Sequence, residues 1–340
     1  MRFQFFDIIK TKNDTREIKG LILKNGIKMV IISDPDIIKS GCCVGVSAGY
    51  LQDEYSGTAH FLEHLLFMGS EKFKKQNDFL NYIISNNGES NAYTEMNSTC
   101  YYLNIDSSKF KKAVEMLSWF FRSPLLDEKH IKSEMEIINS EHEKNKNSDF
   151  WIMDDIFKNF IKTKKYKTFG TGNNDSLKNI TYDDIMKFYN KYYTTDNTYV
   201  CIIDSSSIDD IIKDYVPYFE DIKIKKYDGK DDNKEDISLI DDNLIIFKSI
   251  SSYNFLNIYL VLEGSEFHQE EYQLIKFINY MVGKEYDKSF SFELIENYNV
   301  KSIESKIEYF LDKQVIININ ILLNNDNYDN IENIMGCFQK

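Results

Sequence analysis

The chain has 340 residues, of which 42% are hydrophobic and 28% charged, and this is the composition of a globular protein long enough for two domains. Its formal net charge of −13 at pH 7 excludes nucleic acid as a partner, because nucleic-acid binding needs a basic surface. No apolar stretch is long enough to cross a membrane, so a membrane is excluded as well.

The first elements predicted along the chain are β-strands. Asn25-Gly26 lies between two apolar runs and predicts the turn of a β-hairpin. A strand over 43–46 follows and leads into a helix that contains His60. Further helices are expected over 76–87, 108–121, 128–147, 150–163 and 181–194, and a further strand over 199–203. This mixture predicts an α+β fold, in which helices pack on a mixed or antiparallel sheet.

The helix near residue 60 carries the most informative motif, His60-Phe61-Leu62-Glu63-His64. Side chains four residues apart lie one above the other on an α-helix, so both imidazoles can reach one metal ion, with the Glu63 carboxylate beside them. Ser56 is expected to cap the start of this helix and Gly69 to end it. Zinc accepts imidazole nitrogen and carboxylate oxygen, and a catalytic zinc site uses three protein ligands.

The third ligand is expected from the predicted helix over 128–147. Glu134 and Glu141 are separated by two helical turns and therefore share one face, whereas Glu136 and Glu143 point in other directions. We assign Glu141 as the third metal ligand. Glu134 is then expected to support the ligands from behind.

The C-terminal part of the chain repeats the pattern of the first part. The stretch over 223–242 is rich in Lys and Asp and is predicted to be a linker between a domain over 1–222 and a second domain over 243–340. The second domain is expected to begin with strands over 244–247 and 255–262, and two helices and long strands follow. Its order echoes that of the first domain.

The cysteines and the N-terminus indicate where the protein works. An odd number of cysteines without a CxxC pair gives no disulfide framework, which favours a reducing compartment. The apolar run within 1–10 is too short for a signal peptide. We therefore expect a cytoplasmic protein. The cysteines are Cys42, Cys43, Cys100, Cys201 and Cys337.

The order His-x-x-Glu-His is the inverted form of the commoner zinc-protease motif. On these residues and on stretches around them, the chain resembles the insulinase (pitrilysin-type) family of zinc metallopeptidases, and within it the insulin-degrading enzyme branch. The stretches that carry the resemblance are Leu23-Lys24-Asn25-Gly26-Ile27 with Asp34-Pro35, Gly57-Thr58-Ala59-His60 and the residues up to Gly69, Ser90-Asn91-Ala92-Tyr93-Thr94, Ser140-Glu141-His142-Glu143-Lys144-Asn145 and Phe169-Gly170-Thr171-Gly172-Asn173.

The resemblance implies a role for each of the motif residues. It implies a Zn²⁺ cofactor bound by the two motif histidines and Glu141, with Glu134 as the supporting acidic residue. It also implies that Glu63 is the general base of peptide hydrolysis. The exposed strand that contains Asn91, Ala92 and Tyr93 is implied to bind peptide substrates as an added strand.

The resemblance further implies two homologous insulinase-like domains, the second apparently incomplete, and a C-terminal half or second chain that closes the catalytic chamber. The predicted function is that of a zinc metalloendopeptidase that hydrolyses short unfolded peptides. Two alternatives stay open. One is a scaffold of the same fold that is catalytically weak or inactive, and the other is a subunit that, like a processing peptidase, is active only with a second chain.

Overall fold

The computed structural model describes residues 3–161, 164–167, 170–229, 246, 249–251, 253–264, 269–310, 314–324 and 330–338. The chain divides into two compact units, Met1–Lys146 with Lys165–Asn233, and Asn147–Lys164 with Lys234–Lys340. The predicted domain boundaries at 222 and 243 stay predictions. The strand predicted over 244–247 and most of the predicted linker lie outside the described residues.

A seven-stranded sheet forms the centre of the first unit, in the order β1-β2-β3-β7-β4-β6-β5. Neighbouring strands are antiparallel, except that β3 and β7 are parallel. The sheet is therefore mixed, as predicted. The strands are β1 (Phe3–Phe6), β2 (Glu17–Leu23), β3 (Lys28–Ser33), β4 (Lys39–Val46), β5 (Glu89–Thr94), β6 (Thr99–Asp106) and β7 (Thr198–Asp204).

The helices of the first unit confirm the helical pattern of the sequence. They are α1 (Thr58–Leu66), α2 (Asp78–Ser85), α3 (Ser107–Arg122), α4 (Ile131–Asn145), α6 (Asn174–Leu177), α7 (Tyr182–Tyr192) and α8 (Ile208–Glu220). Short 3-10 turns, η1 (Tyr50–Gln52), η2 (Glu128–His130), η3 (Lys164–Lys167) and η4 (Thr195–Asn197), join them. Helix α4 is shorter than predicted because its first turn is the 3-10 turn η2.

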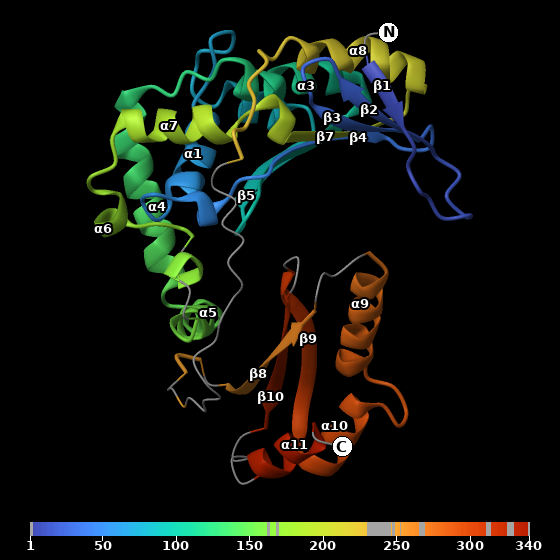
Figure 1. Ribbon diagram of the computed structural model, residues 1–340, viewed down its shortest axis with the longest axis vertical. Helices are drawn as coiled ribbons and strands as arrows, with labels where there is room; N and C mark the ends of the chain where they lie inside the picture. Colours follow the sequence, from blue (N-terminus) through green and yellow to red (C-terminus); the bar gives the residue numbers. More distant parts are fainter. Residues whose placement is uncertain are drawn as a thin grey trace. The chain divides into compact units, whose positions relative to one another are not determined.

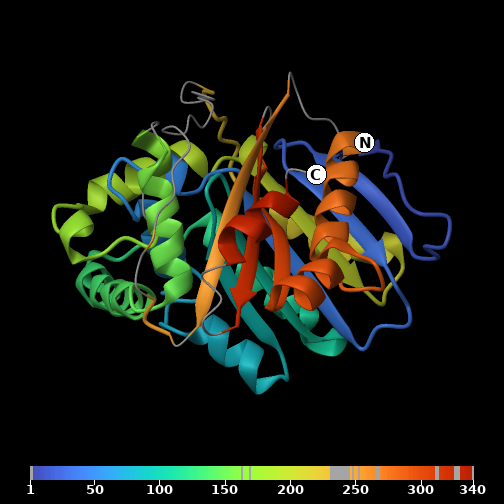
Figure 2. The same cartoon turned by 90° about the horizontal axis from the view of Figure 1, so that it is seen from below.

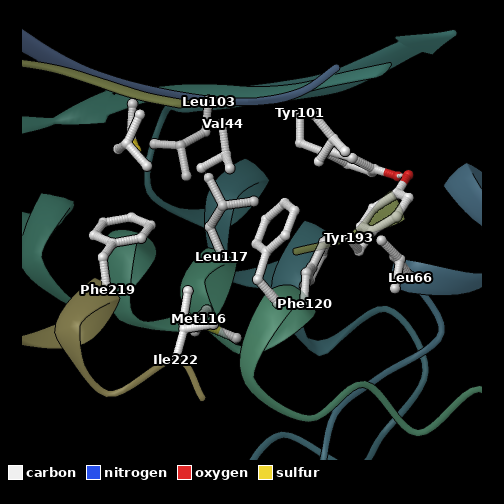
Figure 3. Close-up of a cluster of buried hydrophobic side chains, with 14 of the residues drawn as sticks. Val44, Leu66, Tyr101, Leu103, Met116, Leu117, Phe120, Tyr193, Phe219 and Ile222 are labelled. Carbon is white, nitrogen blue, oxygen red and sulfur yellow. Dashed lines mark hydrogen bonds between the residues drawn. The ribbon is translucent and has the colours of Figure 1, made fainter. Parts of the chain in front are cut away.

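The core of the first unit lies between one face of the sheet and helices such as α3 and α8 (Figures 1 and 3). Successive strand residues point to opposite faces, so that Val44 of β4 and Leu103 of β6 are buried on the helix side. Leu117 and Phe120 of α3 pack against them (Figure 3). Tyr101 is fully buried there, and its hydroxyl hydrogen-bonds that of Tyr193 at 2.7 Å.

The predicted hairpin turn at Asn25-Gly26 is confirmed by the antiparallel pairing of β2 with β3. Gly26 has a φ of 99°, which lies in the left-handed region that glycine adopts without strain. The side-chain amide of Asn25 donates hydrogen bonds to the carbonyls of Phe219 and Ile222 at 2.8 and 3.2 Å. The turn is thereby tied to the end of α8.

The second unit contains a three-stranded antiparallel sheet in the order β8-β10-β9. Helix α9 lies alongside β9 (Figures 1 and 2, orange and red). The elements are α5 (Asp149–Asn159), β8 (Asn254–Glu263), α9 (Gln269–Gly283), α10 (Phe290–Tyr298), β9 (Val300–Phe310), β10 (Gln314–Leu323) and α11 (Ile331–Cys337). The strand predicted over 255–262 is therefore confirmed as β8.

The two units share one order of elements. The run β8-α9-α10-β9-β10-α11 repeats β4-α1-α2-β5-β6-α3, and in both sheets the first strand pairs with the third, which lies in the middle. This repeat confirms the prediction of two homologous domains. Within the part of the chain that the structure describes, no strand pairs with β8 as β7 pairs with β4. The described second unit thus corresponds to only part of the first.

Candidate metal centre

Helix α1 presents His60 and His64 one turn apart on the same face. Their rings stand nearly perpendicular, with centroids 4.8 Å apart and an interplanar angle of 82°. Phe61, Leu62 and Leu65 on the other faces of α1 are buried in the core. The two histidine side chains remain 12% and 20% exposed, so the helix holds them at the border between core and solvent.

The start of α1 is fixed by Asp53, and the prediction that Ser56 caps this helix is wrong. Gly57 occupies the N-cap position with a φ of 96°. The Asp53 carboxylate accepts hydrogen bonds from the N–H groups of Gly57 at 2.7 Å and Ala59 at 2.9 Å. Burial raises the pKa of Asp53 to about 8, and these backbone donors oppose that rise. A side chain from outside the helix therefore satisfies the amides that Ser56 was expected to cap.

A contact between two glycines orients the first histidine. A Cβ atom at Gly57 would lie only 2.4 Å from the Cα of Gly172, so the two backbones approach as closely as they do because side chains are absent. This contact brings the carbonyl of Thr171 within 2.9 Å of His60 Nδ1. A carbonyl only accepts, so Nδ1 carries the proton and Nε2 is left with a free lone pair. Phe169 of the same stretch lies outside the described residues.

Glu134 orients the second histidine from helix α4. Its carboxylate is almost completely buried and lies 3.3 Å from His64 Nδ1. Burial lowers the pKa of His64, but the hydrogen bond to Glu134 and the nearby carboxylates outweigh burial and hold the pKa above its usual value. Because Nδ1 makes this hydrogen bond, the Nε2 atom of His64 faces away from Glu134.

The two Nε2 atoms converge on Glu141. Its Oε2 atom lies 3.7 Å from His60 Nε2 and 3.8 Å from His64 Nε2. One ligand atom from each of the three residues falls within 4.8 Å of the others, and within the described ranges no other such group of metal-ligating residues occurs. Nitrogen from two imidazoles and oxygen from one carboxylate is a donor set that suits zinc, so the residues present fit this ion.

Glu63 lies beside this cluster in a largely dry environment. Its side chain is buried, and Thr94 donates a hydrogen bond from Oγ1 to Glu63 Oε2 at 2.6 Å. Burial raises the pKa of Glu63, while His60 and Thr94 lower it. One carboxylate oxygen is thus held by Thr94 at the end of β5, and Oε1 is left for other chemistry.

The predicted substrate strand is β5, which forms one edge of the sheet next to α1 (Figure 1). Asn91, Ala92 and Tyr93 lie along it and pair with β6 on one side only. The backbone groups on the other side have no strand partner among the described residues, so an extended peptide can pair there.

No role was predicted from the sequence for Asp53, Thr94 or Thr171, although Thr94 and Thr171 lie in the stretches that carry the family resemblance. Asp53 accepts from backbone N–H groups, and Thr171 acts through its backbone carbonyl; such contacts leave no local pattern in the sequence. For Thr171, the sign in the sequence is the pair of glycines that the contact needs, Gly57 and Gly172.

Comparisons with known proteins agree with this geometry. Residues 28–171 match the family described as Insulinase (Peptidase family M16), and residues 179–336 match the family described as Peptidase M16 inactive domain. The description of the second family as inactive agrees with the sequence of α9. This helix takes the place in the second unit that α1 has in the first, but it contains no histidine.

Several relatives share sequence with nearly two thirds of this chain. The insulin-degrading enzyme homolog of Dictyostelium discoideum is 36% identical over 230 residues, 64% of this chain and 24% of that protein. The insulin-degrading enzyme of Homo sapiens is 34% identical, and the A-factor-processing enzyme of Saccharomyces cerevisiae 31%, each over 64% of this chain and 22% of its own length. The matched part is therefore less than a quarter of each relative.

Solved structures share the fold. Pitrilysin superposes with a TM-score of 0.83 at 21% identity, over 99% of this chain and 37% of its own. A protease from Helicobacter pylori superposes with a TM-score of 0.80 at 18% identity, over 95% of this chain and 79% of its own. Among the described residues, no helix is both long and apolar enough to span a membrane.

The role of Asp53 can be tested by removing its carboxylate. We expect Asp53→Ala to lower the free energy of unfolding by about 1–2 kcal/mol, because the N–H groups of Gly57 and Ala59 lose their acceptor. Urea denaturation followed by circular dichroism measures this. The neighbouring Glu54→Ala is the control, since Glu54 makes only a surface ion pair with Lys187 and its loss should cost about 0.5 kcal/mol or less. Equal losses in both variants would show that Asp53 does not hold the helix.

Proposed function

The chain belongs to the insulinase family, peptidase family M16, and on this premise we propose that it is a zinc-dependent endopeptidase. His60, His64 and Glu141 hold the zinc ion in this proposal. The observation that carries it is the approach of two imidazole Nε2 atoms and one carboxylate oxygen to within 4.8 Å of one another. Three protein ligands leave a fourth position open, as catalysis requires.

The hydrogen bonds behind the histidines support this assignment. Each ring uses Nδ1 for a protein partner, Thr171 for His60 and Glu134 for His64, and offers Nε2 toward Glu141. Such outer hydrogen bonds fix the tautomer and orientation of metal-binding histidines. A pair of surface histidines without a metal would have no need of two buried partners.

Proton transfer is the part of the reaction that falls to this chain's own residues. When bound, zinc supplies a Lewis acid that polarises the scissile carbonyl. Glu63 takes a proton from the attacking water at Oε1, because Oε2 is engaged by Thr94, and delivers it to the leaving amine.

Peptides are the substrate class that we infer. A substrate added to β5 as a further strand would bond to the backbone beside Asn91, Ala92 and Tyr93, which places few demands on its side chains. Two of the relatives are named for insulin and for A-factor. For this chain we propose short unfolded peptides as a class.

The rate of hydrolysis is expected to depend on parts that the relatives have beyond the matched region. The matched part of this chain covers less than a quarter of the length of each relative above, so a further half or a second chain that closes the site is part of the proposal. The lack of one transition-state donor typically costs about 10²–10³ in rate. The scaffold alternative explains less, because a scaffold has no use for a buried Glu63 held by Thr94. The cytoplasmic location stays a prediction.

Replacing the proposed base tests the chemistry. We expect Glu63→Gln to retain zinc and to lower the hydrolysis of a fluorogenic peptide by at least about 100-fold, because an amide cannot relay the proton. Zinc analysis of the same sample separates loss of the base from loss of the metal. Undiminished hydrolysis by this variant would refute the role of Glu63.

Replacing the proposed third ligand tests the metal site without any need for turnover. We expect about one zinc per wild-type chain by elemental analysis, and a sharp fall in Glu141→Gln, because only two ligands remain. The matched control is Glu143→Gln on the same helix, where Glu143 pairs with Lys146 at 2.5 Å and is 49% exposed. If both variants bind zinc as the wild type does, Glu141 is not a ligand.

A further inference from the structure

Three cysteines gather on the sheet face of the first unit that points away from the core. Cys43 of β4 lies directly opposite Cys201 of β7, and Gly45 of β4 lies directly opposite Cys100 of β6. Their chain neighbours, such as Val44, Tyr101 and Val200, point into the core instead. Aromatic side chains on the same face are exposed, with 45% of Tyr93, 38% of Tyr102 and 42% of Tyr199 accessible to solvent. Solvent therefore reaches this face.

Two of the three thiols are in contact. The Sγ atoms of Cys43 and Cys100 lie 3.0 Å apart and share a hydrogen bond. The residues are diagonal neighbours on adjacent strands, and the space above Gly45, opposite Cys100, is open. Tyr93 of β5 lies directly opposite Cys100 in the strand register and is a third polar group beside this sulfur.

These contacts make the two thiols unequal. The hydrogen bond from Cys43, together with the nearby Tyr93 hydroxyl, lowers the pKa of the Cys100 thiol to about 7, against the effect of burial. The same bond raises the pKa of Cys43, which keeps its proton. The lowered pKa favours the thiolate of Cys100 over that of Cys43, and the thiolate is the reactive form. Burial raises the pKa of Cys42, on the core side of β4, so that this thiol is inert.

We propose that Cys100 and Cys43 form an oxidation site for peroxides, in which Cys100 is the attacking thiol and Cys43 the resolving thiol. The observation that carries it is the contact between the two sulfur atoms beside an exposed sheet face. The site uses none of the proposed metal ligands, and it does not depend on peptide hydrolysis by this chain.

The reaction balances with one peroxide. The Cys100 thiolate attacks a peroxide oxygen, the O–O bond breaks, and the leaving hydroxide takes up a proton to give water and a sulfenic acid at Cys100. The Cys43 sulfur then attacks the sulfenic sulfur, the S–O bond breaks, and the leaving hydroxide takes the Cys43 proton as a second water. The two sulfurs together lose two electrons and form one disulfide, and the peroxide is reduced.

The position of the pair gives this oxidation a structural consequence. Tyr93 of β5 lies directly opposite Cys100 of β6, so a disulfide at Cys100 changes the side chain that Tyr93 faces. Tyr93 lies on the edge strand β5 and directly precedes Thr94, which holds Glu63 in the reduced protein. Oxidation of the pair would therefore act beside the edge of the sheet.

Peptide mapping of the 340-residue chain tests the proposal. The folded protein is treated with hydrogen peroxide, free thiols are blocked with N-ethylmaleimide, and digests are read by mass spectrometry. We expect a linked pair of peptides that contain Cys43 and Cys100, lighter by two hydrogens than the reduced pair and released by dithiothreitol. Absence of this link, with all thiols blocked as in the untreated protein, would overturn the proposal.

Variants assign the two roles. In Cys43→Ser we expect no link, and a dimedone adduct on Cys100, because the sulfenic acid has lost its resolving thiol. The matched controls Cys42→Ala and Cys201→Ser should both keep the link, although Cys42 is adjacent to Cys43 in sequence and Cys201 faces it across the strands. A link from Cys43 to Cys201 in place of Cys100, or an adduct on Cys43 in Cys100→Ser, would contradict the assignment.

Discussion

The close approach of Gly57 to Gly172 is the constraint on which the metal centre depends. The two backbones meet where neither residue has a Cβ atom, and the contact places the Thr171 carbonyl on His60 Nδ1. Asp53 fixes the same end of α1 by accepting from its first amides. The position and the tautomer of His60 thus both follow from how the first turn of α1 is anchored.

Helix α4 supplies the other half of the centre through one helical face. Glu134 is buried and orients His64, and Glu141, two turns later, faces both imidazoles from the more exposed end of the cluster. One helix therefore provides both the support and the proposed third ligand. The sheet contributes through its edge strand, since Thr94 of β5 holds Glu63 and the residues just before it form the proposed peptide-binding edge. The same strand, β5, thereby positions the proposed base and the proposed substrate.

Much of this could be predicted from the sequence because it depends on local periodicity. The spacing of His60 and His64 and that of Glu134 and Glu141 follow from the pitch of an α-helix, and the hairpin at Asn25-Gly26 follows from turn chemistry. The cap of α1 was predicted wrongly because Asp53 reaches the helix from outside it. The roles of Thr94 and Thr171, and the contact of Cys43 with Cys100, depend on strand register and loop packing, which local patterns do not encode.

The duplicated order of elements places α9 where α1 stands, and α9 contains no histidine, so among the described residues the candidate centre occurs in the first unit alone. Binding of one metal ion by two histidines and Glu141 can be examined by X-ray absorption at the zinc edge of the zinc-loaded 340-residue chain. With these ligands we expect a nitrogen and oxygen shell at about 2.0–2.1 Å with the outer scattering of two imidazoles. A sulfur shell at about 2.3 Å would instead place the metal on the cysteines and exclude this ligand set.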